Sequence, residues 1–129
     1  MKSIEQIQNF EKTIGQLNVL IGDFSELSKK KPDGPVNKFK LSLVNSILEK
    51  LNQIIDDENK PFKDFALFSE EEFTTNSDIL VILNQYHNNS RGFAEKNVVK
   101  NNYNIYWLID QKRSDQVVYL SELFKEKDG

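Results

Sequence analysis

The sequence predicts a mainly α fold of the α+β class, with a three-helix bundle-like core, a short acidic helical turn and a C-terminal β-hairpin. Two long segments in the first half of the chain place apolar residues three and four positions apart, which is the period of an amphipathic helix. A third segment with this period follows a helix-start signal at Asn76-Ser77-Asp78. The last part of the chain instead holds two aromatic, β-branched runs on either side of a polar stretch, which indicates a hairpin.

The length of 129 residues fits a single domain, 1–129, which at this size buries roughly two thirds of its unfolded surface. The chain has no cysteine, which excludes disulfides, thiolate metal sites and cysteine nucleophiles and suits a reducing compartment. Glu5 and Glu11 interrupt the first residues where a signal peptide needs an apolar run, and no later segment reaches the length of a membrane span. We therefore expect a soluble cytoplasmic protein without a membrane partner.

A first helix, over 3–30, is predicted by six apolar residues in the heptad pattern of a bundle or coiled coil. These residues are Ile7, Phe10, Ile14, Leu17, Ile21 and Phe24. The pattern fits a long helix in an intramolecular bundle or a homodimer that pairs through the six residues, and its shortness favours the first. Gly15 and Gly22 lie inside the helix, where each costs about 1 kcal/mol relative to alanine. They predict the close approach of a neighbouring helix.

A second helix, over 36–57, follows a turn enforced by Pro32 and Gly34. The connection is short, which favours antiparallel neighbours. Its wide apolar face is formed by Leu41, Val44, Leu48, Leu51 and Ile55. The acidic run Asp56-Asp57-Glu58 lies at its predicted carboxyl end, where negative charge opposes the helix dipole.

The connector over 60–74 contains the stretch KPFKDFALFSEEEF, which combines four phenylalanines with four carboxylates. Ser69 and Glu72 form a capping-box pattern, which predicts a short acidic helical turn that stays in water. The preceding rings are expected to pack between the helices, because an exposed row of phenylalanines favours aggregation. If they were exposed, they would form a binding site. These rings are Phe62, Phe65 and Phe68.

One third helix is predicted over 77–97, and its polar, glycine-containing stretch 87–92 is compatible with a kink or a break. The hairpin is predicted over 103–120 and a terminal turn over 121–127. A two-stranded hairpin is marginal alone, so we expect it to lie against the helices. Trp107 is the expected anchor, and its indole N–H needs a partner when it is buried.

Residues that catalysis or metal binding would require are sparse. The single histidine, His87, lies three positions before Ser90 and beside Arg91, but no nucleophile-elbow glycines flank the serine. The acidic runs lack the alternating ligands and central glycine of an EF-hand loop, and the five glycines form no phosphate-binding loop. We therefore predict no enzyme activity, no catalytic residues, no bound metal and no cofactor.

Charge is distributed unevenly along the chain. Residues 56–78 carry a net charge of −6, whereas the rest of the chain carries +3. An acidic surface interleaved with aromatic rings suits a basic protein partner. We therefore expect a non-enzymatic protein-binding module of the inhibitor, immunity, antitoxin or adaptor type. Its candidate partner-binding residues are Asp56, Asp57, Glu58, Asp64, Phe68, Glu70, Glu71, Glu72 and Phe73.

Two other hypotheses concern the remaining surface. Lys29–Lys31 and Lys112-Arg113 suggest a nucleic-acid-associated regulator, although the low basicity of the chain argues against a nucleic-acid partner. The other hypothesis is a structural subunit that oligomerises through its first helix.

Overall fold

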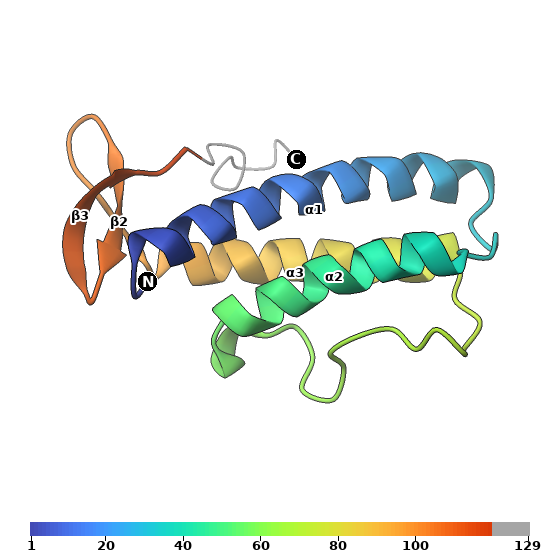
Figure 1. Cartoon of the computed structure of the whole chain (residues 1–129). Coiled ribbons are helices and arrows are strands. Elements are labelled where there is room, and N and C mark those ends of the chain that lie inside the picture. The colour runs from blue at the N-terminus through green and yellow to red at the C-terminus, as the bar shows by residue number, and fades with distance from the viewer. Residues whose placement is uncertain (120–129) are drawn as a thin grey trace.

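Three helices and a small sheet make up the computed structural model, which describes residues 1–119 (Figure 1). Helix α1 spans Ile4–Lys30, α2 spans Lys38–Ile54 and α3 spans Asn76–Glu95. The three helices lie side by side, and an antiparallel sheet covers the end of the bundle where α1 begins and α3 ends (Figure 1). The predicted mainly α, α+β fold is confirmed.

The apolar seam of α1 forms the centre of the core within one chain. Ile21 is half-buried, and the other five seam residues are at most 2% exposed. They join one cluster with buried side chains of the other two helices, such as Leu48 and Leu83. The seam therefore packs against the other helices of the same chain, which is the intramolecular arrangement that the pattern favours, and a homodimer through these residues stays a prediction. The buried seam residues are Ile7, Phe10, Ile14, Leu17 and Phe24.

The two glycines of α1 lie on its outer face. Gly15 and Gly22 are exposed, and a Cβ added at either position would meet nothing within 4 Å. The predicted close approach of a neighbouring helix at these glycines is therefore wrong within residues 1–119. The helix forms because its seam is buried, which outweighs the low helix propensity of glycine.

Helix α2 begins after Asn37, whose side-chain oxygen accepts a hydrogen bond from the Lys40 N–H at 2.8 Å. It ends at Ile54, three residues before the predicted end at 57. The acidic run then continues into a separate 3-10 turn, η1, over Asp57–Asn59. The chain thus leaves the helix before the carboxylates, which removes them from its last turn.

Helix α3 starts one residue earlier than the 77 predicted, because Thr75 caps it. The Asp78 N–H donates to the Thr75 hydroxyl at 3.2 Å, and the Asp78 carboxylate accepts from the Thr75 N–H at 3.0 Å. The helix runs without interruption to Glu95, two residues before the predicted end at 97, so the stretch 87–92 does not break it. Ser90 and Phe93 are buried on its inner face, so packing against the bundle holds the polar stretch helical.

The loop between α1 and α2 is hydrogen bonded to the chain that enters α3. The Val36 N–H donates to the Thr74 carbonyl at 3.0 Å, and the Asn76 N–H donates to the Gly34 carbonyl at 3.0 Å. The Asn76 side chain, itself buried, donates to the Lys31 carbonyl at 2.9 Å. These bonds fix the end of the connector against the helix loop.

The sheet has three antiparallel strands in the order β1-β2-β3, namely Val98–Lys100, Ile105–Ile109 and Lys112–Val117. The predicted hairpin is confirmed as β2 and β3, joined by a tight turn in which Asp110 and Gln111 have positive φ values of 50° and 66°. Strand β1 was not predicted, because three residues are too few to show an alternating pattern.

The start of the predicted hairpin differs from the structure. Its first strand begins at Ile105 rather than at 103, and Tyr103 lies in the preceding turn with 92% of its surface exposed. Residue 120 and the predicted terminal turn over 121–127 lie outside the described residues.

Trp107 on β2 attaches the sheet to the helices, as predicted. The residue is completely buried, and its ring packs edge-on against Phe10 of α1 at 5.6 Å between centroids. Phe10 in turn contacts Phe93 of α3 at 5.5 Å. The indole N–H donates to the Glu11 carboxylate at 2.7 Å, which supplies the partner that a buried indole requires.

Candidate functional site

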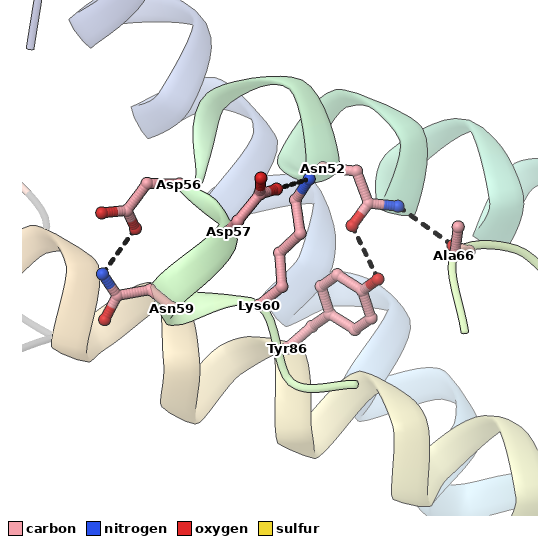
Figure 2. Close-up of polar contacts among 7 residues, drawn as sticks. All are labelled: Asn52, Asp56, Asp57, Asn59, Lys60, Ala66 and Tyr86. Carbon is pink, nitrogen blue, oxygen red and sulfur yellow. Dashed lines mark hydrogen bonds and ion pairs between the residues drawn. The ribbon is translucent and has the colours of Figure 1, made fainter. Parts of the chain in front are cut away.

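The connector between η1 and α3 follows one flank of α2 and is held there by two asparagines. The Asn45 amide donates to the Phe68 carbonyl and accepts from the Phe68 N–H, both at 2.9 Å. The Asn52 amide donates to the Ala66 carbonyl at 3.0 Å and accepts from the Tyr86 hydroxyl at 2.7 Å (Figure 2). Asn52 therefore joins α2, α3 and the connector in one hydrogen-bond chain.

The three rings of the connector form a half-buried row. Phe62 and Phe65 meet edge-to-face at 6.0 Å, and Phe65 and Phe68 do so at 5.0 Å. Phe65 and Phe68 pack against the core cluster, whereas none of the three is fully buried. The rings therefore serve mainly as architecture, with one side of the row left in water.

A cleft of about 660 Å³ opens between the end of α2 and the connector. Two lysines and two aspartates are among its lining residues, together with Phe62, Phe65 and Asn52. The Lys60 ammonium donates to the Asp57 carboxylate at 2.8 Å (Figure 2), and this hydrogen bond and charge lower the pKa of Asp57. The charges of the cleft are balanced, so the excess negative charge of the connector lies outside it.

The two acidic runs lie at opposite ends of the connector (Figure 1). Each carboxylate of the first run has a partner: Asp56 accepts from the Asn59 amide, Asp57 pairs with Lys60, and Glu58 lies 3.8 Å from the Lys96 ammonium.

The second run is different. The side chains of Glu70, Glu71 and Glu72 are all exposed, and none of them forms an ion pair within the described part of the chain. The predicted short helix is reduced to a single turn, in which the Glu72 N–H donates to the Ser69 carbonyl at 3.4 Å. The charges of Asp56–Glu58 are partly offset by their partners, whereas those of Glu70–Glu72 are not offset within residues 1–119. The Glu70–Glu72 end of the connector is therefore the more negative of the two.

Phe73 directly follows this turn and is 75% exposed. The next residue, Thr74, is buried, and its carbonyl accepts the hydrogen bond from Val36. Thr75 forms an isolated bridge with Pro35 and caps α3. An exposed aromatic side chain is thus presented beside three unpaired carboxylates on a fixed backbone.

The predicted site residues thus divide into two groups. All seven carboxylates are exposed, as is Phe73, whereas Phe68 is half-buried with both of its backbone groups bound to Asn45. Sequence reasoning missed Asn45, Asn52 and Tyr86, which position the connector. The seven-residue spacing of the two asparagines, along one edge of the apolar stripe of α2, is the signal that could have identified them.

The residues considered for catalysis do not form an accessible group. Ser90 is completely buried, and its hydroxyl has no hydrogen-bond partner among the described residues. Arg91 pairs with Glu95 at 3.2 Å, and His87 is half-buried. A substrate could therefore not reach the Ser90 hydroxyl without local opening of α3.

The two lysine-containing stretches also lie apart. Lys29–Lys31 end α1, whereas Lys112-Arg113 belong to the sheet at the opposite end of the molecule (Figure 1). The Arg113 guanidinium stacks over the Tyr106 ring at 5.2 Å. Among the described residues, no three histidine or carboxylate side chains gather as a metal site would require.

No helix within residues 1–119 is both long and apolar enough to span a bilayer. Neither a family model, nor a curated protein, nor a solved structure matches this chain.

Proposed function

We propose that the chain is a non-enzymatic protein-binding module that engages a basic partner through its acidic-aromatic surface, defined as the exposed side chains of residues 56–73. The observation that carries the proposal is the exposure of Phe73 beside Glu70, Glu71 and Glu72. An exposed aromatic ring beside carboxylates combines an anchor for a partner's pocket with negative charge that attracts basic side chains. Inhibitors, immunity proteins, antitoxins and adaptors are the classes that this proposal includes.

The two ends of the surface have different roles in the proposal. At the Glu70–Phe73 end, the ring enters a pocket of the partner while the unpaired carboxylates meet basic side chains at the rim. At the Asp56–Glu58 end, the carboxylates already have partners in the chain, so they mainly steer the approach of a positive surface. Removing the Phe73 ring should therefore speed dissociation, whereas reversing charge at Asp56–Glu58 should slow association.

Affinity capture from the native host, followed by mass spectrometry, tests the proposal. The bait proteins are the wild type, a Phe73→Ala variant and a variant with Glu70, Glu71 and Glu72 changed to lysine. A matched control changes Glu5, Glu49 and Asp115 to lysine, since these are exposed carboxylates elsewhere with the same change in net charge.

The expected result is a partner that the wild type and the matched control retain and that both surface variants lose. Circular dichroism on each variant excludes loss of fold as the reason. A partner that is captured equally by all four proteins, or the absence of any partner, would overturn the proposal.

A further inference from the structure

An apolar groove runs along the outer face of α1 and α2. Two cavities of about 420 Å³ and 300 Å³ follow one another between the helices, and Leu20 and Leu43 line both. Val19 is 65% exposed and Phe39 is 70% exposed at its edges. Nothing within residues 1–119 covers these side chains, so the groove is an unpartnered helix face.

This face is separate from the acidic-aromatic surface. Successive residues of an α-helix are rotated by about 100°, so the positions of Asn45 and Asn52 lie on one flank of the buried stripe of α2. Phe39 and Leu43 lie on the other flank, against α1. The connector therefore covers one side of α2 and leaves the other side open.

Two opposite charges on α1 lie at equal distances from Val19. Lys12 and Glu26 lie seven residues before and after it, and residues seven apart on a helix are offset by only about 20°. Lys12 is exposed, and the Glu26 side chain is 67% exposed, with only a long 3.7 Å contact to Lys29. Lys12, Val19 and Glu26 thus follow one another along one line of the helix surface, as a positive, an apolar and a negative side chain.

We propose that this face binds a second copy of the chain in a two-fold dimer, in which the two α1 helices pack antiparallel with their Val19 side chains at the axis. In this arrangement Lys12 of each copy lies opposite Glu26 of the other, because both are equally far from the axis. A parallel pair would instead place Lys12 against Lys12 and Glu26 against Glu26. The charges of Lys12 and Glu26 are therefore complementary only in the antiparallel orientation.

The size of the face sets the expected strength of the dimer. From Lys12 to Glu26 the helix is about 21 Å long, and two helices side by side are about 20 Å wide. The footprint of about 420 Å² per copy is roughly half of the ~800 Å² per partner that stable complexes bury. The dimer is therefore weak and forms as the protein concentration rises.

Sedimentation equilibrium of the full chain, over concentrations up to the millimolar range, tests the proposal. The wild type is expected to pass from monomer to dimer, and Val19→Asp to remain a monomer because two aspartates would meet at the axis. Lys12→Glu and Glu26→Lys are each expected to weaken dimerisation about tenfold, since each turns two attractive pairs into repulsive ones. The double variant Lys12→Glu/Glu26→Lys restores both pairs and should dimerise like the wild type.

Val81→Asp is the matched control, because Val81 is an exposed valine on α3. It should dimerise normally, and circular dichroism verifies the fold of each variant. A wild type that stays monomeric at every concentration, or a Val19→Asp variant that still dimerises, would overturn the proposal. Failure of the double variant to recover would overturn the antiparallel arrangement. All these variants keep Glu70–Phe73 intact, so the result is independent of the proposed partner binding.

Discussion

Trp107 and Glu11 form a polar contact at the edge of the core. Burial raises the pKa of the Glu11 carboxyl, because the charged form loses water, and the hydrogen bond from Trp107 only partly opposes the shift. The folded chain therefore keeps this proton over a pH range in which the unfolded chain has released it. The contribution of Glu11 to stability is then greatest below its ordinary pKa of 4.5 and falls as the pH rises through the raised value.

Changing Glu11→Gln should remove this pH dependence while keeping an oxygen to accept from Trp107. The free energy of unfolding of the variant minus that of the wild type is expected to be larger at about pH 7 than at about pH 4. Urea unfolding at the two pH values measures the difference. Glu11→Leu leaves the indole N–H without an acceptor and should lower stability by about 1–3 kcal/mol. A pH-independent difference for Glu11→Gln would contradict the assigned shift.

Ser90 carries a buried hydroxyl that has no partner among the described residues. Replacing Ser90 with alanine should stabilise the chain by about 1 kcal/mol, because the unsatisfied hydroxyl is removed from the core. Ser46→Ala is the control, since Ser46 is exposed on α2 and its change reports only helix propensity. Chemical denaturation at low protein concentration compares the two, and a Ser90→Ala variant less stable than the wild type would show that the hydroxyl has a partner.

Helix α1 contains two positions where a better helix former fits without contact. Gly15→Ala and Gly22→Ala should each raise the free energy of unfolding by about 1 kcal/mol, because both added methyl groups enter open space. Gly34→Ala is the contrasting change, since its Cβ would lie 2.8 Å from the Asn76 amide nitrogen and should destabilise the loop. Thermal unfolding distinguishes these outcomes, and a destabilising Gly15→Ala or Gly22→Ala would contradict the exposed placement.

The connector depends on the two asparagines of α2 rather than on a strand ladder. Asn45→Ala removes both partners of the Phe68 backbone and should lower stability by about 1–2 kcal/mol. Amide hydrogen exchange is expected to accelerate at Phe68 and to stay slow at Leu83 in the core. Asn84→Ala, at an exposed position of α3, should change neither rate. Unchanged exchange at Phe68 in the Asn45→Ala variant would refute this role of Asn45.

The helices and the hairpin could be predicted because their apolar residues repeat at the period of the element they form. The seam of α1 and the buried face of α2 correspond directly to that period. Strand β1 could not be predicted, because three residues carry too little pattern and its pairing with β2 is set by the tertiary fold. The unbroken α3 shows the same effect, since packing overrides the weak local preference of 87–92.

The candidate site was predicted only in part. Exposure of its carboxylates follows from their charge, but the separation of the two acidic runs follows from the path of the connector, which periodicity does not describe. The exposure of Val19 and Phe39 could not be predicted either, because an apolar residue is assigned to the core unless its surroundings are known.

The burial of Trp107 between the sheet and the helices predicts cooperative unfolding of the described fold. Because its ring contacts Phe10 and its indole binds Glu11, loss of the helices should expose it at once. Denaturation followed by tryptophan fluorescence and by far-ultraviolet circular dichroism should therefore give coincident transitions. Fluorescence that changes well before the helical signal would show that the sheet separates first.

The connector is attached to α2 through its main chain, so its side chains are free to differ between engineered variants and between related sequences. Asn45 and Asn52 bind main-chain atoms at positions 66 and 68, and every amino acid carries those carbonyls. Side chains at 69–73 can therefore be exchanged without changing these attachment points. Substitutions at 69–73 should therefore change which partner the surface binds without lowering the stability of the bundle, much as antibody loops vary on a constant framework.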